Sequence, residues 1–425
     1  MTTDHDAARK RALLLDQKDP LAAFRHQFVV ADPGMIYLEG NSLGRLPRNV
    51  SSRVTRAVET EWGADLIRGW NGGWWDSPTR IGEKIGTLLG AGPGQVVVCD
   101  QTSINLFKLA SAALDLRPQR PRIVTDTLNF PSDLYILQGL VRLLGNRHEI
   151  VRIGSSDGEI SPDLAALEAA LDESVALVTL SHVTFKSGYL YDMQMITELA
   201  HRCGALVLWD LSHSAGAVPI GLDACNADFG IGCTYKYLNG GPGAPAFLYV
   251  NRRLHEQAIA PIWGWWGESQ PFTFGLDYRP AAGVHRFLTG TAPMLSTSAL
   301  EAALSPIMEA GMERVREKST ALTQYAIELY DARLAPLGLA LGSPRDPNRR
   351  GSHVSLRHPE GYRISRALIE EMSVIPDYRE PDNLRMGFAP LYVSFLDVWE
   401  CIDRLQHVIT EKRFEKYPVQ RLTVT

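Results

Sequence analysis

An aspartate, a histidine and a lysine in the middle of the chain have the types and the spacing of a cofactor site. The apolar run 205–209 (ALVLW) leads into Asp210, and His213 follows three residues later. A second, mostly apolar segment, 228–233, leads into Lys236. If both segments are strands of one α/β sheet, their carboxyl ends lie together at the edge where such sheets bind ligands.

This pair predicts pyridoxal phosphate (PLP) chemistry. A lysine forms a Schiff base with the aldehyde of PLP, and a carboxylate pairs with the protonated pyridine nitrogen so that the ring can withdraw electrons. The stretch alone also allows a simpler interpretation, in which Asp210 caps a helix and Lys236 is a solvated surface lysine.

An anion-binding turn is predicted earlier in the chain. Residues 96–99 (VVVC) predict a strand, and Thr102 and Ser103 precede a helix that is expected to begin at Ile104. The free N–H groups and the dipole at a helix N-terminus favour a phosphate group. The alternative is an ordinary N-cap by Thr102 or Ser103.

Three loops have unusual compositions. The loops 66–78 (LIRGWNGGWWDSP) and 263–267 (WGWWG) are rich in tryptophan and glycine. They are predicted to cover an aromatic ligand or to form a subunit interface, because aromatic residues in loops are less readily explained as core. The loop 39–44 (EGNSLG) is interpreted as a turn, or as a place where backbone approaches a ligand closely.

The elements that must position these residues alternate between strands and helices, which predicts a mostly parallel sheet with helices on both faces. Further strands are predicted at 122–126, 150–153, 175–180 and 245–250. Helices are predicted at 4–28, 162–171 with Ser161 as N-cap, 193–203, a long stretch 298–334, 364–371 and 395–412. The mixed pattern after Gly338 favours a smaller α+β domain.

Length and composition narrow the class of protein. A chain of 425 residues is long enough for two domains, and its net charge of −5 gives no footprint for nucleic acid. The N-terminus lacks the apolar core of a signal peptide, and no apolar run reaches the ~18 residues of a membrane span. Five cysteines are scattered without a CxxC pair, at positions 99, 203, 225, 233 and 401. We therefore expect a cytoplasmic protein without nucleic-acid, membrane or metal partners.

Seven segments together resemble the kynureninase family, whose members are PLP enzymes of fold type I in the aminotransferase class V group. The segments are YLEGNSLGRLP (37–47), TSINLFK (102–108), NFPSD (129–133), LSHVTFKSG (180–188), WDLSHSAG (209–216), TYKYLNGGPG (234–243) and GWWGE (264–268). The aspartate–lysine stretch is shared across the whole group, whereas the GNSLG and GWWG loops resemble kynureninases, of the bacterial type.

The resemblance implies a fold, an activity and an assembly. It implies an aspartate-aminotransferase-like large domain at 49–300 with a mostly parallel seven-stranded sheet. A smaller C-terminal α+β domain at 301–425 is joined by an N-terminal segment at 1–48. The implied reaction is hydrolytic Cβ–Cγ cleavage of L-kynurenine, and less well of 3-hydroxy-L-kynurenine, to anthranilate or 3-hydroxyanthranilate and L-alanine in tryptophan catabolism. A homodimer with active sites shared between subunits is also implied.

Carried over by motif, the resemblance assigns a role to individual residues. Lys236 resembles the Schiff-base lysine that also transfers the α-proton, and Tyr235 a proton relay. Cofactor contacts are implied for Thr102, Ser103, Phe130, Pro131, Ser132, Asp133, Ser181, Asp210, His213, Tyr235 and Lys236, and for Trp265 and Thr291 of the neighbouring subunit. Substrate contacts are implied for Arg385, whose planar fork suits the α-carboxylate, and for Trp70, Gly290, Thr291, Asn41 and Ser42.

Two positions bear on substrate preference. In the family pattern, animal enzymes that prefer 3-hydroxykynurenine have a histidine at one position and an asparagine at another. At the corresponding positions, this chain has Trp70 and Thr291. A buried hydroxyl without a hydrogen bond costs about 1–3 kcal/mol. We therefore expect L-kynurenine to be the better substrate.

Three other functions are compatible with parts of the sequence. A cysteine desulfurase or selenocysteine lyase of the same fold needs a reactive cysteine near the small domain, but Cys401 lies in a predicted amphipathic helix. An aminotransferase shares the lysine, aspartate and arginine but releases a keto acid. A binding module without catalysis is expected to have lost one of Lys236, Asp210 and Arg385, and all three are present.

Overall fold

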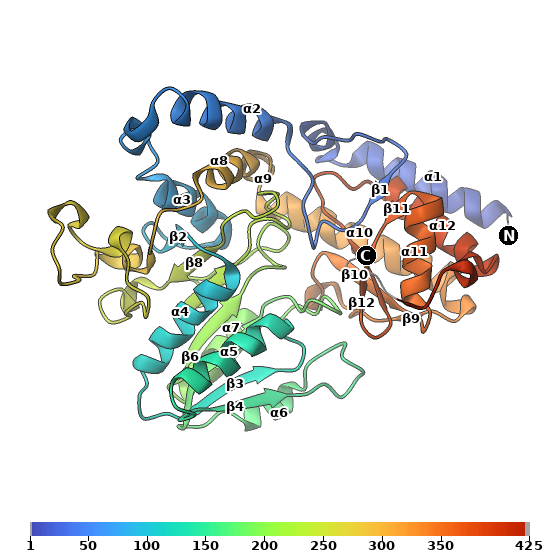
Figure 1. Ribbon diagram of the computed structural model, residues 1–425. Helices are drawn as coiled ribbons and strands as arrows, with labels where there is room; N and C mark the ends of the chain where they lie inside the picture. The colour runs from blue at the N-terminus through green and yellow to red at the C-terminus, as the bar shows by residue number, and fades with distance from the viewer. Residues whose placement is uncertain (1, 421–425) are drawn as a thin grey trace.

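The computed structural model describes residues 2–420, and its largest element is a seven-stranded sheet (Figure 1). Its strands are β2 (Val96–Val98), β3 (Arg122–Asp126), β4 (Glu149–Ile153), β5 (Val175–Ser181), β6 (Leu206–Asp210), β7 (Phe229–Gly232) and β8 (Phe247–Val250). They lie in the order β2-β8-β7-β6-β5-β3-β4. Strands β4, β3, β5, β6 and β7 pair in parallel, and β8 is antiparallel to both of its neighbours. The expected mostly parallel sheet is confirmed.

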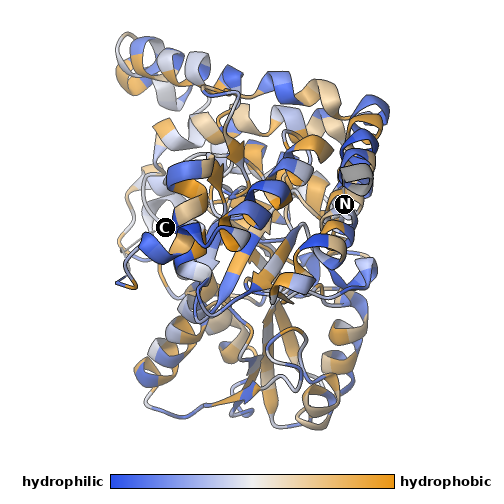
Figure 2. Ribbon diagram, turned by 90° about the vertical axis from the view of Figure 1, so that its right-hand side faces the viewer, coloured by the Kyte–Doolittle hydropathy of each residue, from blue (hydrophilic) through white to orange (hydrophobic). Residues whose placement is uncertain are grey.

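The sheet separates two apolar cores, because successive side chains of a strand point to opposite faces. In β6, Leu206 and Leu208 belong to the core that contains Leu109 of helix α4 (Thr102–Asp115). Val207 and Trp209 belong to the other core. Both faces of the sheet are therefore covered. Figure 2 shows the hydrophobic strands lying between helices that carry hydrophilic as well as hydrophobic residues.

In residues 2–420, nine α-helices precede the longest one, α10 (Met312–Arg333). They are α1 (Thr2–Lys18), α2 (Arg48–Arg56), α3 (Ser77–Leu89), α4 (Thr102–Asp115), α5 (Pro131–Leu143), α6 (Leu164–Ala169), α7 (Met193–Arg202), α8 (Met294–Ala303) and α9 (Ser305–Ala310). Among residues 2–420 there is no helix with both the length and the apolar character needed to cross a bilayer.

A second, four-stranded sheet lies beside the first and supplies one wall of the site. It consists of β12 (Asp377–Arg379), β13 (Asn383–Gly387), β10 (His353–Arg357) and β9 (Ala340–Leu341), in that order and all antiparallel. Helices α10 (Met312–Arg333), α11 (Gly361–Met372) and α12 (Phe395–Thr410) accompany it.

The N-terminal segment joins this second unit. Strand β1 (Ile36–Tyr37) pairs in parallel with β11 (Val374–Ile375), and α1 contacts α12 (Figure 1). Strands β1 and β11 form a two-stranded sheet of their own. The loop 39–44 begins where Glu39 bridges to Gly387 of β13, and it ends where Gly44 N donates to Tyr235 O at 2.8 Å.

Three helix predictions were wrong at their boundaries. The helix expected at 4–28 ends at Lys18, two residues before Pro20, which disfavours helical backbone in the residue that precedes it. Helix α6 is capped by Asp163, whose Oδ1 accepts a hydrogen bond from Ala166 N at 2.9 Å, and Ser161 lies outside it. The stretch 298–334 is divided among α8, α9 and α10, with Gly311 in a left-handed conformation at φ 76°.

Candidate active site

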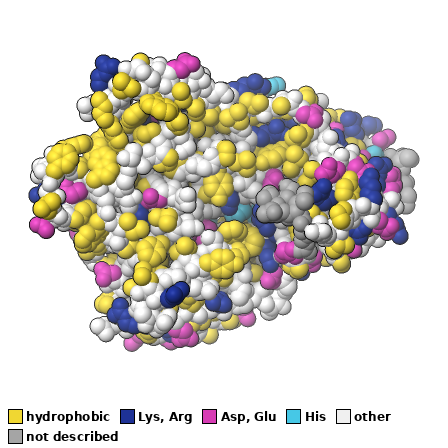
Figure 3. All heavy atoms as spheres, viewed as in Figure 1, with side chains coloured by type: hydrophobic (Ala, Val, Ile, Leu, Met, Phe, Trp, Pro, Cys, Tyr) yellow, Lys and Arg dark blue, Asp and Glu magenta, His cyan; other side chains and the backbone are white. Residues whose placement is uncertain are grey.

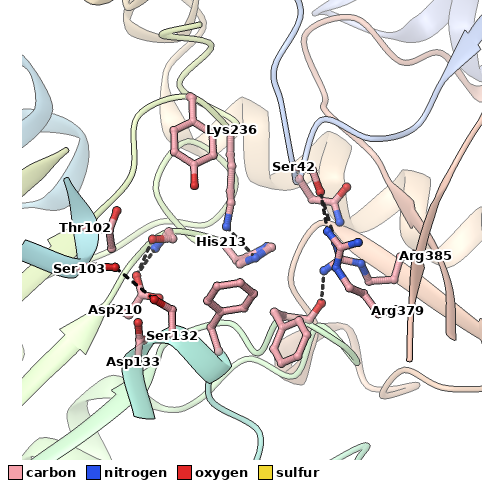
Figure 4. Close-up of a pocket in the computed structure, with 15 residues that line it drawn as sticks. Ser42, Thr102, Ser103, Ser132, Asp133, Asp210, His213, Lys236, Arg379 and Arg385 are labelled. Carbon is pink, nitrogen blue, oxygen red and sulfur yellow. Dashed lines mark hydrogen bonds between the residues drawn. The ribbon is translucent and has the colours of Figure 1, made fainter. Parts of the chain in front are cut away.

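A cavity of about 210 Å³ lies between the two sheets, at the carboxyl ends of strands β5 and β6 (Figure 4). The position is the one where open α/β sheets bind ligands. Its lining comes from both sheets and from the 39–44 loop: Asn41, Ser42, Thr102, Ser103, Phe130, Ser132, Asp133, Phe185, Asp210, Ser212, His213, Tyr235, Lys236, Arg379 and Arg385.

Asp210 and Lys236 face this cavity, as their spacing predicted. Asp210 is the last residue of β6, and its Oδ1 accepts hydrogen bonds from Ser212 N at 2.9 Å and Ser212 Oγ at 2.6 Å. These bonds fix the direction of the carboxyl group. The interpretation of Asp210 as a helix cap and of Lys236 as a surface lysine is therefore wrong, since both side chains line the pocket.

The ammonium of Lys236 has a neutral partner. Its Nζ lies 2.9 Å from Nε2 of His213. Burial and the nearby charge of Lys236 hold the pKa of His213 well below its ordinary value. His213 is therefore uncharged at neutral pH and can accept a hydrogen bond from the lysine.

The predicted anion-binding turn lies where two helices begin. Helix α4 begins at Thr102, and helix α5 begins at Pro131. The hydroxyl of Ser103 lies 3.1 Å from that of Ser132, so the two first turns meet at one edge of the cavity. The expected start at Ile104 and the N-cap by Thr102 or Ser103 are wrong, because the N-cap position is Gln101. Both hydroxyls instead belong to the first turn of α4.

Asp133 stands beside Asp210 and has a different protonation state. It lies in the first turn of α5 and is almost completely buried. Burial and the neighbouring Asp210 raise the pKa of Asp133 well above its ordinary value, and the two carboxyl groups share a hydrogen bond. Of the two neighbouring carboxyl groups, Asp133 is therefore the one whose neutral form is favoured, and in that form it donates a hydrogen bond to Asp210.

Tyr235 also keeps its proton. The neighbouring Cys233 and burial raise the pKa of its phenol. The hydroxyl group of Tyr235 is therefore a hydrogen-bond donor in the pocket at neutral pH.

The opposite wall of the cavity is positively charged (Figure 4). The guanidinium of Arg385, 1% exposed, donates from Nη1 to the carbonyl oxygen of Phe185 and from Nη2 to Asp377. Arg379 donates from Nη1 to the other oxygen of Asp377 at 2.5 Å, and Ser42 Oγ donates to Asp377 Oδ2 at 2.8 Å. Two arginines and a serine thus surround one buried carboxylate.

Two groups at this wall have unused hydrogen-bonding capacity. Within residues 2–420, neither polar atom of the Asn41 amide has a hydrogen-bond partner, although Asn41 is fully buried. Nε of Arg385 likewise lacks a partner in the described chain. Buried polar groups are normally paired, so this wall is suited to a polar ligand.

Glu39 adds a second carboxyl group to the positively charged wall. Burial and the neighbouring Asp377 raise the pKa of Glu39 from 4.5 to about 7. The folded chain therefore holds a proton that the unfolded chain loses at lower pH, and this contribution to stability is lost as the pH rises from 4.5 to about 7. Between about pH 5 and pH 8, we expect the free energy of unfolding of wild type to fall relative to that of Glu39→Gln, measured by urea denaturation. Parallel curves would contradict a raised pKa at Glu39.

Several predicted site residues lie outside the cavity. Pro131 is the first residue of α5, and Ser181 lies behind the lining, where its hydroxyl donates to Asn129 Oδ1 at 2.5 Å. Four more of the predicted site residues do not line the pocket that the described chain forms, namely Trp70, Trp265, Gly290 and Thr291.

The tryptophan loops form one aromatic cluster at the surface. The ring of Trp70 lies 5.5 Å from that of Trp265 and 5.3 Å from that of Trp266. Trp265 is 38% exposed, and the neighbouring Phe272 and Phe274 are 67% and 81% exposed. Figure 3 shows hydrophobic side chains on this side of the molecule, where Figure 1 shows the segment around residues 260–280. Trp266 is buried, at 3% exposed, so the cluster has a buried base and an exposed outer part.

Four residues near the site were missed by sequence reasoning, namely Phe185, Ser212, Asp377 and Arg379. Asp377 and Arg379 are two residues apart, and that spacing places both side chains on one face of a strand. The strand register, which pairs Asp377 with Arg385, is what brings them to the pocket.

Relatives of known sequence match nearly the whole chain. A kynureninase from Pseudomonas fluorescens is 45% identical over 425 residues, which are 99% of this chain and 99% of the relative. A kynureninase from Burkholderia pseudomallei (strain 1106a) is 44% identical over 406 residues, with 94% and 95% covered. The family described as kynureninase C-terminal domain matches residues 315–405.

Solved structures show the same fold at low sequence identity. The cysteine desulfurase CsdA from Escherichia coli has a TM-score of 0.76 at 18% identity, over 92% of this chain and 98% of its own. The cysteine desulfurase from Thermococcus onnurineus NA1 has a TM-score of 0.75 at 20% identity, over 89% and 95%. A C-DES variant with glycine covalently linked to its PLP cofactor has a TM-score of 0.75 at 21% identity, over 90% and 98%.

Proposed function

The chain belongs to the kynureninase family, and we propose that the cavity around Lys236 is where it carries out the reaction of that family. That reaction is the PLP-dependent hydrolytic cleavage of the Cβ–Cγ bond of L-kynurenine, which yields anthranilate and L-alanine. One observation carries the assignment of the site: Lys236 lies in a single cavity between Asp210 on one wall and Arg385 on the other.

The donors and acceptors of the cavity fit PLP. Lys236 can condense with the aldehyde, and the carboxylate of Asp210, held by Ser212, can accept a hydrogen bond from the protonated pyridine nitrogen. The first turns of α4 and α5 offer N–H groups and the hydroxyls of Ser103 and Ser132 to a phosphate. When bound, PLP supplies a carbonyl that takes up an amine and a ring that withdraws electrons from the substrate.

The neighbouring residues support these roles. The ring of Phe130 lines the cavity and meets the ring of Phe185 edge to face at 5.3 Å, so it can lie against a flat cofactor. Thr102, Pro131 and Ser181 complete the proposed cofactor contacts around the two helix N-termini and behind Asp210.

The proton transfers are assigned to the residues beside the lysine. We propose that Lys236 Nζ moves the α-proton, because its neutral neighbour His213 does not compete for the positive charge. Tyr235, whose phenol keeps its proton, donates a hydrogen bond toward oxygen atoms of the reacting substrate. Both roles, proton transfer by Lys236 and hydrogen-bond donation by Tyr235, use groups that already lie in the pocket.

The polar wall opposite Asp210 is assigned to the amino-acid end of the substrate. Within the described residues, the amide of Asn41 and Nε of Arg385 are buried without partners, and Ser42 lines the same wall. A carboxylate placed here satisfies these donors, and an arginine fork binds it in two places. The α-carboxylate of L-kynurenine is therefore the ligand group we assign to this wall.

We propose a homodimer in which the aromatic cluster faces the partner's cavity. Trp265 and Thr291 lie outside the pocket of their own chain, and exposed aromatic residues surround Trp265. Large exposed apolar patches mark interaction sites. Sedimentation equilibrium tests this assembly, and a monomer that is fully active would contradict it.

The outline of the chain supports two further proposals. We propose a division into an N-terminal segment 1–48, a large domain 49–300 and a small domain 301–425, supported by the pairing of β1 with β11. Limited proteolysis that cuts elsewhere first would count against it.

We also propose a cytoplasmic location, supported by five cysteines that are all unpaired. Recovery of the protein from an oxidising compartment would contradict it.

The function is tested with purified protein loaded with PLP and supplied with L-kynurenine. We expect anthranilate and L-alanine to form in equal amounts, detected by fluorescence and by amino-acid analysis. Alanine without anthranilate, or a keto acid in its place, would assign the cavity to another reaction.

The substrate preference follows from Trp70 and Thr291. We expect a higher kcat/KM for L-kynurenine than for 3-hydroxy-L-kynurenine, by about tenfold, because an indole ring offers a 3-hydroxyl group no acceptor. The same anthranilate assay, run with both substrates at matched enzyme concentration, measures the ratio. A preference for the hydroxylated substrate would show that neither residue contacts that position.

The desulfurase alternative lacks a suitable nucleophile. Cys401 is 1% exposed, and burial raises its pKa to about 12. A reactive cysteine needs a lowered pKa and access to solvent. Among residues 2–420, moreover, the cavity lining includes no cysteine.

A further inference from the structure

A buried carboxylate stands between the two arginines of the cavity. Asp377 and Arg385 face each other across strands β12 and β13, and opposite residues of an antiparallel pair lie on the same face. Arg379 follows Asp377 by two positions and therefore lies on that face as well. The local sequence and the strand register thus bring all three charged groups to one wall of the pocket.

The contacts leave each guanidinium partly available. Arg385 uses Nη1 for Phe185 O and Nη2 for Asp377, while its Nε lacks a partner within residues 2–420. Arg379 uses Nη1 for Asp377 Oδ1 and for its neighbour Tyr378 O at 2.8 Å, and its Nη2 makes a long contact of 3.4 Å with Ser42 Oγ. Both side chains line the cavity (Figure 4).

The charges of this group are not balanced by the protein alone. Two guanidinium groups face one fully buried carboxylate, Asp377, which leaves one positive charge at the wall. Burial and Asp377 raise the pKa of Glu39 to about 7, so this second carboxyl group remains largely neutral below that pH. A buried unpaired charge is costly, and a ligand carboxylate offsets it.

We propose that Asp377 is a positioning residue that holds Arg379 beside Arg385, and that the two arginines together clamp the α-carboxylate of the substrate. The proposal rests on the proposed function, because it names the substrate group that this wall binds. It adds Arg379 as a second carboxylate contact. It also gives Asp377 a role through the arginines, without contact to the substrate.

The test measures equilibrium binding of two small probes to the PLP-loaded protein. L-Alanine carries the carboxylate and L-alaninamide does not, and binding of either is followed by the change in cofactor absorbance. For Asp377→Asn and Arg379→Gln we expect the Kd for L-alanine to rise about 10- to 100-fold, because each change removes a charge from the pair that Arg379 forms with fully buried Asp377. The Kd for L-alaninamide is expected to change by less than about threefold.

A matched control lies on the same small sheet. Arg357 pairs with Asp382 at 3.0 Å outside the cavity, so Arg357→Gln removes an arginine–aspartate pair without touching the clamp. We expect its binding of L-alanine to remain within about twofold of wild type. If Asp377→Asn does not fold, as judged by circular dichroism, the Kd values of Arg379→Gln for the two probes test the clamp.

Two outcomes would overturn the clamp: unchanged binding of L-alanine by Arg379→Gln, or equal weakening of both probes. The result is separate from the fate of the proposed function. Wild-type protein that binds L-alanine tightly and produces no anthranilate would contradict the proposed reaction and leave the clamp to be judged on the variants.

Discussion

Lys236→Ala is expected to lower kcat/KM for L-kynurenine by roughly 10⁴-fold or more, since removal of an essential nucleophile typically has effects of this size. The Nζ atom of Lys236 is the amine of the cavity that lies next to neutral His213. Without it the pocket retains Asp210, the helix N-termini and the arginines, so PLP is expected to bind non-covalently. The measurement is anthranilate formation, together with the visible absorbance of the bound cofactor.

The control is an exposed lysine of the same large sheet unit. Lys84 lies on α3, 40% exposed, where it pairs with Glu301 at 3.7 Å. Lys84→Ala is expected to keep kcat/KM within about twofold of wild type. A Lys236→Ala protein with wild-type absorbance and activity would contradict the site itself, whereas lost activity with wild-type absorbance would separate cofactor attachment from proton transfer.

The parts of the fold that follow from local pattern could be predicted. Alternating apolar strands and helices indicated the parallel sheet, and the strand-end position of Asp210 and Lys236 placed them in one pocket. The segments 364–371 and 395–412 were predicted as helices and correspond to α11 and α12. These features depend on residues close together in the sequence.

The features that were missed depend on contacts between distant segments. Arg379 and Asp377 reach the pocket only because β12 pairs with β13 in one register, and the loop with Ser42 meets them from more than 300 positions away. The break of the 298–334 stretch was visible in Gly311 and Pro306, but neither residue excludes a kinked helix on its own. Register and long-range contacts are set by the whole core.

Fold and sequence comparisons answer different questions for this chain. Desulfurases share the fold with TM-scores of 0.75–0.76 at 18–20% identity, whereas kynureninases share 44–45% of the sequence. A shared fold at this identity does not assign an activity. In this chain, the cavity places arginines and an amide opposite Lys236 and Asp210, and its lining within the described residues includes no cysteine.

Asp210→Asn is expected to lower kcat/KM for L-kynurenine by roughly 10²- to 10⁴-fold. The amide has the shape of the carboxyl group and can keep the hydrogen bonds from Ser212, but it carries no negative charge. A protonated pyridine nitrogen then loses its counter-charge, and the ring withdraws electrons less well. Anthranilate fluorescence measures the rate, and absorbance titration checks that PLP still binds.

The matched variant is Asp133→Asn, whose carboxyl group lies beside that of Asp210 in the same cavity. Burial and Asp210 raise the pKa of Asp133, which favours its neutral form as the donor of a hydrogen bond to Asp210. An asparagine at 133 can donate the same bond from its amide, and we expect a loss of about tenfold or less. Equal losses in the two variants would show that Asp133 acts as a charged group. A large loss at Asp210 with a small one at Asp133 would instead show that one carboxyl of this adjacent pair supplies the charge and the other supplies the proton that orients it.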